Sequence, residues 1–414
     1  MQTTTRTTIP TDLITPLAAY LRLRAAAFGG ASFLLESVDQ GRLGRYSFVG
    51  CGRKIVTFEE AERLGEPVVG YLGYDVVAKL EPTVPLPETG PDFPESQFVV
   101  PELMIRFDHV LGVAEVLAGD PIEVRSLLDG PAPTVPQTRN ARGQLRRFPD
   151  QAEHERRVLV AKEHIRAGDA FQIVVAQRAI RPTSASAFEL YRALRRVNPS
   201  PYLFLLELPD LALVGSSPET VVKCEGARAT LNPIAGTIKP GEGDVEALLS
   251  SEKDRAEHVM LVDLGRNDLS RVCKPGTVRV ERFMKTERYS HVTHLVSEVV
   301  GELEEKRSPY ELLRACFPAG TVSGAPKVRA MQIVSELEDY RRGIYAGAVG
   351  YVFPETGEMD TCIAIRTLVL RDGIAYLQAG GGIVADSDPT EEHQECLNKL
   401  AAIEAAIDLA EAEQ

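Results

Sequence analysis

Two acidic segments place pairs of carboxylates at helical spacing. Asp254 and Glu257 stand three residues apart, and Glu392 and Glu395 repeat that spacing later in the chain. Residues at i and i+3 share one face of a helix. Two helices that each offer such a pair could hold a hard cation through oxygen ligands. Spacing alone favours the simpler interpretation of solvated helix faces, because such patterns are common.

Two segments rich in small residues could approach an anion. Gln378–Ile383 contains three consecutive glycines after a predicted strand, and a glycine run can present backbone N–H groups to an anionic ligand. A tight turn explains the same pattern more simply. Phe317–Lys327 leads into a predicted helix, so its backbone donors and the Thr321 hydroxyl could face a ligand, or form an ordinary loop and N-cap.

Two single residues, Arg366 and His294, are weaker indications of function than these segments. Arg366 ends an otherwise apolar strand pattern, and a half-buried arginine needs a carboxylate from the protein or from a ligand; both alternatives remain open here. His294 is an isolated histidine, which is more often structural than catalytic. The sequence has neither an HExxH motif nor a Ser-His-Asp order, which argues against zinc and hydrolase chemistry.

Helices and hairpins must position these residues. Helices are predicted at Gln151–Ala167, Ala187–Val197, Ser251–Leu264, Tyr310–Ala315, Ala325–Leu337 and Pro389–Ala410. Strands are predicted at Phe171–Ala179, Tyr202–Leu208, Ala212–Gly215, Ala229–Leu231, Tyr345–Phe353, Asp360–Leu370 and Ile374–Leu377. Short turns such as Arg371-Asp372-Gly373 join several strands, so we expect an α+β fold with antiparallel sheets.

The chain divides by composition. Asp129–Gly143 is polar, rich in proline and glycine and without periodicity, which is typical of a linker. We therefore predict an N-terminal domain over 1–140 and a second domain over 141–414. Within the first, the proline-rich stretch Glu81–Pro101 is expected to be a surface excursion without regular structure.

Composition limits the function. Of 414 residues, 46 are Lys or Arg and 59 are Asp or Glu, giving a net charge of −13 that argues against nucleic acid as a partner. No long apolar run or secretory signal is recognised, so no membrane partner is expected. Six scattered cysteines, none in a CxxC pair, are consistent with a reducing cytoplasm.

Ten ordered blocks between Phe171 and Lys399 resemble the chorismate-utilising enzymes, and most closely component I of anthranilate synthase. The similarity also reaches the N-terminal part, and ten blocks in the same order do not arise by chance. The blocks are DAFQIVVAQR, NPSPYLF, VGSSPE, NPIAGT, EKDRAEHVMLVDLGRND, RYSHVTHLVS, FPAGTVSGAPKVRAM, YAGAVGY, MDTCIAIRT and QAGGGIVADSDPTEEHQECLNK.

The resemblance implies the family's fold and a Mg2+ cofactor that grips the ring carboxylate of chorismate. Glu257 and Glu395 match the direct metal ligands, and Asp254 and Glu392 match the supporting carboxylates. Asp254 departs from the glutamate usual at its position. Lys399 matches a residue that approaches the ring carboxylate.

The remaining roles also follow from the resemblance. Glu219 matches the general acid that protonates the C4 hydroxyl, and Thr321 and His294 match residues near that hydroxyl and the ring carboxylate. The enolpyruvyl carboxylate is bound in such enzymes by residues that match Tyr345, Arg366, Gly380, Gly381 and Gly382. The glycine block differs slightly from the usual AGAG.

Three positions bear on the branch of the family. Gln172 replaces the lysine base of water-using relatives, and Ala235 replaces the nucleophilic lysine of many 4-aminodeoxychorismate synthases. Ammonia is therefore the expected nucleophile. No glutaminase segment is recognised, so we expect a separate glutamine amidotransferase subunit to supply it.

Other functions remain open. A 2-amino-2-deoxyisochorismate synthase or a 4-aminodeoxychorismate synthase component I is the nearest alternative. A non-catalytic regulatory paralogue is disfavoured because every expected metal and acid position is filled. A Mg2+-dependent nucleotide transferase is disfavoured because no P-loop is present.

An N-terminal block resembles the tryptophan feedback site of the family. The expected binding residues are Leu35, Glu36, Ser37, Pro201, Tyr202 and Leu203. Only residues 55–69 separate Lys54 from Gly70, where family members carry a longer segment, so feedback by L-tryptophan depends on whether the shortened region keeps its switch. Read without the resemblance, the block is a strand and a turn.

Overall fold

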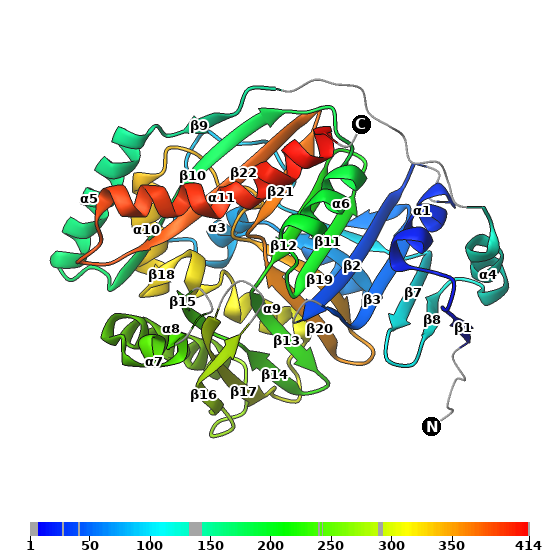
Figure 1. Cartoon of the computed structure of the whole chain (residues 1–414). Coiled ribbons are helices and arrows are strands. Elements are labelled where there is room, and N and C mark those ends of the chain that lie inside the picture. The colour runs from blue at the N-terminus through cyan, green and yellow to red at the C-terminus, as the bar shows by residue number, and fades with distance from the viewer. Residues whose placement is uncertain are drawn as a thin grey trace.

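The computed structural model describes residues 7–26, 29–39, 42–131, 143–238, 241, 243–288 and 293–412. Two large sheets form its centre, and every pairing between described strands is antiparallel (Figure 1). In the first sheet the order is β1 (Thr8–Pro10), β8 (Val113–Ala118), β7 (Leu103–Asp108), β3 (Arg42–Gly52), β2 (Ala31–Asp39), β11 (Tyr202–Glu207), β12 (Ala212–Ser217), β21 (Thr367–Arg371), β22 (Ile374–Ile383), β10 (Gln172–Pro182) and β18 (Gly324–Ala325), and β9 (Arg146–Phe148) pairs with β10.

The second sheet has the order β15 (Ile234–Ile238), β17 (Thr293–Glu302), β14 (Arg228–Leu231), β13 (Thr220–Glu225), β20 (Glu358–Ile363), β19 (Ala348–Phe353), β5 (Val68–Leu72), β6 (Ser96–Val100) and β4 (Lys54–Val56), and β16 (Arg279–Arg288) pairs with β17. The described helices are α1 (Pro16–Ala26), α2 (Phe58–Leu64), α3 (Val77–Leu80), α4 (Pro121–Asp129), α5 (Gln151–Arg166), α6 (Ala187–Val197), α7 (Asp244–Ser250), α8 (Glu252–Ser270), α9 (Pro309–Cys316), α10 (Lys327–Leu337) and α11 (Pro389–Ala412), with short 3-10 turns η1 (Tyr74–Val76) and η2 (Gly320–Val322). The predicted α+β class is confirmed.

Side chains alternate between the two faces of each strand, so each sheet packs against the other sheet on one face and against helices on the other. The result is four layers. In β11, Leu203 and Leu205 join the core beneath α6 and α11, whereas Phe204 and Leu206 join the core between the two sheets. Helices α1, α6 and α11 cover the outer face of the first sheet (Figure 1). Helices α8 and α9 pack on the outer face of the second sheet, around Val222. The inter-sheet space is therefore enclosed on both sides.

Local signals set the helix starts. At α8, the Ser251 side chain accepts the N–H of Asp254, and at α11 the Asp388 carboxylate accepts the N–H groups of Thr390 and Glu391. The predicted starts of these two helices are confirmed to within one residue. Both carboxylate pairs therefore lie in the first two turns of their helices.

Three predictions from the sequence were wrong. The strand predicted over Asp360–Leu370 is interrupted at residues 364–366, where the chain passes from β20 in one sheet to β21 in the other. The strand predicted from Tyr345 begins only at Ala348. The stretch Glu81–Pro101 is not wholly irregular, because Ser96–Val100 forms β6 between β4 and β5.

Both sheets combine strands from the two sides of residue 140. Strand β2 pairs with β11 in the first sheet, and β5 pairs with β19 in the second. The domain boundary at residue 140 stays a prediction, and most of the predicted linker Asp129–Gly143 lies outside the described residues. Between β4 and β5, the short segment after Lys54 forms α2, capped by Thr57.

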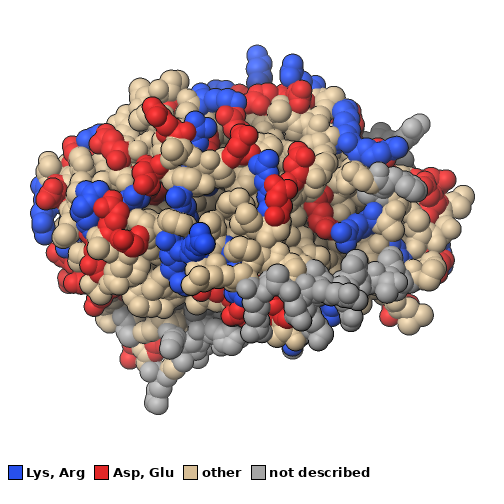
Figure 2. Space-filling model, turned by 90° about the horizontal axis from the view of Figure 1, so that it is seen from above, with Lys and Arg blue, Asp and Glu red and all other residues tan. Residues whose placement is uncertain are grey.

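On the face drawn in Figure 2, basic and acidic side chains of the described residues are interspersed. None of the helices in the described part of the chain combines the length and the apolar character that a membrane-spanning helix needs.

Candidate active site

The candidate site lies where the chain twice passes between the sheets. Glu219 stands between β12 and β13, and Arg366 stands between β20 and β21. The two crossings are joined by hydrogen bonds from the Ile363 N–H to the Glu219 carbonyl, 2.9 Å, and from the Ser216 N–H to the Arg366 carbonyl, 3.1 Å. These hydrogen bonds hold Glu219 and Arg366, which are distant in the sequence, side by side.

Glu219 is suited to hold a proton near neutral pH. Burial raises the pKa of its carboxyl to about 7, although the Thr321 hydrogen bond and the charges of Lys399 and Arg366 act in the opposite direction. The Thr321 hydroxyl donates to Glu219 Oε1 at 2.8 Å. A carboxylic acid that keeps a substantial protonated fraction near pH 7 and is held in one orientation can act as a general acid.

Arg366 carries a charge that the described residues leave without a partner. It has a positive φ of 49°, is half-buried, and burial lowers the pKa of its guanidinium. No ion pair or side-chain hydrogen bond engages that guanidinium within the described ranges. A desolvated, unpaired arginine is a ready binder of a carboxylate ligand.

The three glycines of β22 make room for three polar side chains. A Cβ atom at Gly380 would lie 2.9 Å from the Tyr345 hydroxyl, and one at Gly381 would lie 2.8 Å from Glu392 Oε2. A Cβ atom at Gly382 would lie 2.6 Å from Gln172 Nε2. Side chains from three different elements thus converge on this strand, and any larger residue would displace them.

The two carboxylates of α11, Glu392 and Glu395, differ in burial and in their partners. Glu392 is buried, and its Oε1 atom accepts the Ser387 hydroxyl at 2.7 Å. Its Oε2 atom has no hydrogen-bond partner in the described part of the chain. Burial raises the pKa of this carboxyl. Glu395 is half-exposed and pairs with Lys399 at 2.7 Å, and Lys399 also donates to the Gly380 carbonyl. Ser387 has no counterpart among the sequence predictions, although it lies in the turn just before the predicted helix start.

On α8, Glu257 Oε1 accepts Gln172 Nε2 at 2.9 Å. Asp254 lies against Gly236, where an added Cβ would stand 3.3 Å from the Asp254 Cγ atom. The charge of Lys253 acts to lower the pKa of Glu392, so the first turns of α8 and α11 lie near one another. Glu257 (through Gln172), Glu392 and Glu395 therefore lie near the glycines of β22, whereas Asp254 lies against Gly236 of β15. A common site for the four carboxylates stays a prediction.

A metal ion is chemically compatible with this region. The donors are all carboxylate oxygens, which suit Mg2+, and the buried Glu392 Oε2 atom is an acceptor that no described residue satisfies. In the described residues no three acidic, histidine or cysteine side chains are close enough to form a metal site in this conformation.

His294 is the second residue of β17, beside β15. Its Nδ1 atom lies 3.3 Å from the Gly236 carbonyl, and burial lowers the pKa of the imidazole, so its neutral form is favoured. The charge of Arg366 acts on it in the same direction, which places His294 at the edge of the Glu219–Arg366 region.

The predicted tryptophan residues lie apart from these groups, on β2 and β11. Leu203 is paired with Glu36 on the face toward α6, whereas Leu35 and Tyr202 belong to the core between the sheets. The Glu36 carboxylate already accepts the Tyr191 hydroxyl and pairs with Arg195 at 3.0 Å.

The other members of that set are partly buried. Ser37 stands at an irregularity of β2, and Pro201 precedes Tyr202 at the start of β11. The Tyr202 hydroxyl contacts Thr220 at 2.7 Å, one residue from Glu219. The site stays a prediction, and the Tyr202–Thr220 contact connects its region to the candidate acid.

Comparison with known proteins now identifies the class. A family model described as chorismate binding enzyme matches residues 46–405, and the chain belongs to this family. The Thermus thermophilus protein named anthranilate synthase component 1 is 42% identical, with 98% of each chain covered. A Schizosaccharomyces pombe protein named probable anthranilate synthase component 1 is also 42% identical, with 97% of this chain and 92% of the relative covered.

Solved structures of similar proteins support the same family assignment. Anthranilate synthase component I from Streptococcus pneumoniae superposes with a TM-score of 0.78 at 33% identity, covering 95% of this chain and 99% of that one. The menaquinone-specific isochorismate synthase of Escherichia coli also gives a TM-score of 0.78, but at 21% identity it supports the fold alone. The resemblance recognised in the sequence is confirmed.

Proposed function

We propose that this chain is the large, aminating subunit of an anthranilate synthase, which converts chorismate and ammonia to anthranilate, pyruvate and water, the first step of tryptophan biosynthesis. The observation that carries the proposal is the Glu219 carboxyl, with a pKa raised to about 7, beside Arg366, whose guanidinium has no ion-pair partner among the described residues. The names of relatives about 40% identical over nearly the whole chain support the choice of reaction.

Chorismate is a dianion, so its binding needs two cationic or donor-rich places. Arg366 and Tyr345 bind the enolpyruvyl carboxylate, together with backbone N–H groups of the Gly380–Gly382 run. Lys399 approaches the ring carboxylate from α11. A bound Mg2+, held by Glu257 and Glu395 and supported by Asp254 and Glu392, would offset the charge of that carboxylate and fix its orientation.

Hydroxide is a poor leaving group, so the C4 hydroxyl must receive a proton. Glu219 donates it, and the hydroxyl leaves as water while ammonia adds at C2. Thr321 orients the Glu219 carboxyl through the 2.8 Å hydrogen bond, and neutral His294 lies at the same edge of the site. Loss of pyruvate then gives the aromatic product.

The nucleophile is ammonia rather than activated water. Gln172 occupies the position of the general base of water-using relatives, and its amide donates to Glu257 instead of accepting a proton. A separate glutamine amidotransferase subunit supplies the ammonia in the complete enzyme. All six cysteines are free and buried, in keeping with a cytoplasmic location.

Anthranilate formation can be measured directly. Purified protein mixed with chorismate, Mg2+ and an ammonium salt at alkaline pH is expected to produce anthranilate fluorescence over a low background, because the chain contains no Trp. Release of 2-amino-2-deoxyisochorismate without pyruvate would assign the chain to that alternative. Consumption of chorismate without ammonium would contradict the aminating reaction.

We further propose that L-tryptophan inhibits the enzyme by binding near Leu35, Ser37 and Tyr202. Millimolar tryptophan is expected to bind, followed by its own fluorescence, and to lower anthranilate formation, because it would favour a conformation that binds chorismate less well. Ser37→Phe is expected to weaken that inhibition, since Ser37 packs closely on Gly44. A melting curve checks that the variant is folded. Unchanged inhibition in folded Ser37→Phe would contradict the proposed site.

A further inference from the structure

A second cavity lies between the sheets, beside β22. It shares Tyr345 with the candidate active site, but none of the other predicted site residues line it. Its walls carry the rings of Phe93, Tyr340, Tyr345 and Tyr376, and Phe93 meets Tyr376 edge-on with 5.2 Å between ring centroids. Such walls favour a planar apolar group.

The cavity is lined by two arginines and, among the described residues around it, by no acidic side chain. Arg342 is fully engaged. Its Nε atom donates to Glu338 at 2.8 Å, and its other nitrogens donate to Glu338 and to the carbonyls of Val322 and Val174. Arg342 therefore holds the wall together and is not free to bind a ligand.

Arg178 is different. Its guanidinium lies over the Tyr340 ring, 3.2 Å from the ring centroid, and also faces Phe148 at 5.1 Å. Its Nη1 atom is buried and has no hydrogen-bond partner in the described part of the chain. A buried guanidinium N–H without an acceptor is costly unless a ligand supplies one.

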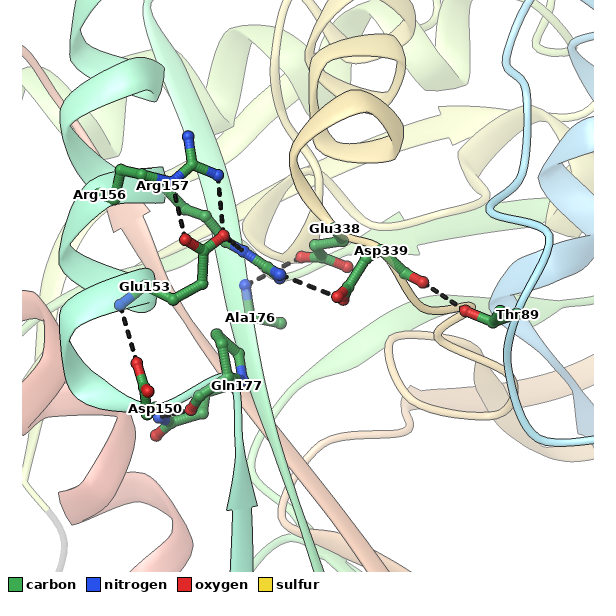
Figure 3. A network of polar contacts seen from close by, with 10 residues as sticks. Thr89, Asp150, Glu153, Arg156, Arg157, Ala176, Gln177, Glu338 and Asp339 are labelled. Atoms are coloured by element: carbon green, nitrogen blue, oxygen red, sulfur yellow. Dashed lines mark hydrogen bonds and ion pairs between the residues drawn. The ribbon is translucent and has the colours of Figure 1, made fainter.

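The two nearby acidic residues, Glu338 and Asp339, already pair with other arginines. Figure 3 shows Arg157 between Glu153 and Asp339, with N–O distances of 3.0 and 3.1 Å. Glu338 accepts the Ala176 N–H at 2.9 Å as well as Arg342. The same network ties the Asp339 carbonyl to Thr89, so the segment that carries Tyr340 is held in place.

We propose that this cavity binds a small aromatic carboxylate, with its carboxylate on Arg178 and its ring among Phe93, Tyr345 and Tyr376. The carboxylate supplies the acceptor that Nη1 lacks, and the rings supply the stacking surface. Because none of the described residues that line the cavity is acidic, an aromatic amino acid would bury its ammonium group without a partner and bind less well. In a chain of net charge −13, a locally positive cavity selects anions.

Benzoate is a suitable probe, and calorimetry of the whole chain measures its binding. We expect benzoate to bind the wild type and Arg366→Met alike, and to bind Arg178→Met at least about 10-fold more weakly. The exposed Arg63 provides a matched control, and Arg63→Met should bind like the wild type. Binding lost in Arg366→Met but kept in Arg178→Met would place benzoate in the candidate active site and overturn the proposal.

Two further probes test the ligand class. Phenylalanine and inorganic phosphate are each expected to bind Arg178 more weakly than benzoate does, because one adds an unpaired ammonium and the other lacks a ring. Phosphate binding as tight as benzoate binding, and equally sensitive to Arg178→Met, would show that the rings contribute nothing and would overturn the aromatic assignment.

A labelling experiment keeps the proposal testable if Arg178→Met fails to fold. Gln378 lines the cavity, and all six native cysteines are buried, so Gln378→Cys introduces one reactive thiol there. Benzoate is expected to slow its modification at least about 5-fold, scaling with site occupancy. Glu225→Cys on the surface should be unaffected. Equal labelling of the Gln378→Cys thiol with and without benzoate would overturn the proposal, whatever the calorimetry shows.

Discussion

Glu219→Gln is expected to lower kcat by about 10²- to 10⁴-fold while changing the KM for chorismate little. The amide keeps the size of the side chain and can still contact Thr321, but its N–H protons are not acidic enough to be transferred to the leaving hydroxyl. Steady-state rates with ammonium as the nitrogen source measure the effect. Glu225→Gln, an exposed position on the following strand, is the matched control and should retain full activity.

The pH profile adds an independent check. The raised pKa of about 7 means that the Glu219 carboxyl is mostly protonated below pH 7 and mostly ionised above it. At constant free ammonia, the wild-type rate should therefore fall as pH rises through the pKa, and Glu219→Gln should lose that limb. A variant in which KM rises with kcat unchanged would make Glu219 a binding residue.

Local signals in the sequence located the helices that carry the site. The caps at Ser251 and Asp388 depend on neighbouring residues, so the starts of α8 and α11 were predictable. The passage of the chain from one sheet to the other at Arg366 was not predictable. The residues around Arg366 are apolar and look like one continuous strand. Only the pairing of β20 and β21 with different sheets shows that they are two strands.

The glycines of β22 illustrate the same limit. Taken alone, a run of three glycines favours a tight turn over an anion site, but the three glycines lie inside strand β22, so the turn interpretation was wrong. In the structure each glycine faces a polar side chain from a different part of the chain: Tyr345, Glu392 and Gln172. Contacts of that kind depend on the order of strands in the sheet, which no local pattern encodes. The cavity at Arg178 was unpredictable for the same reason.

The candidate metal region leads to the second large effect. Glu257→Gln and Glu395→Gln are each expected to reduce ammonia-dependent activity at least about 100-fold, because an amide cannot supply the charge of a carboxylate ligand. Glu252→Gln and Glu391→Gln change exposed carboxylates in the first turns of the same two helices, and both should remain active. These controls remove the same charge from each helix without touching the predicted ligands.

Binding of Mg2+ itself must change in parallel. Calorimetric titration of the protein with Mg2+ in the presence of chorismate should give a signal in the wild type and in the two controls, and a greatly weakened one in Glu257→Gln and Glu395→Gln. Glu395 contacts Lys399 in the structure, so in a titration without chorismate Lys399→Met should leave Mg2+ binding no weaker than in the wild type, since it removes a competitor for the carboxylate. Near-normal activity and Mg2+ affinity in both glutamine variants would show that the two helices present only solvated acidic faces.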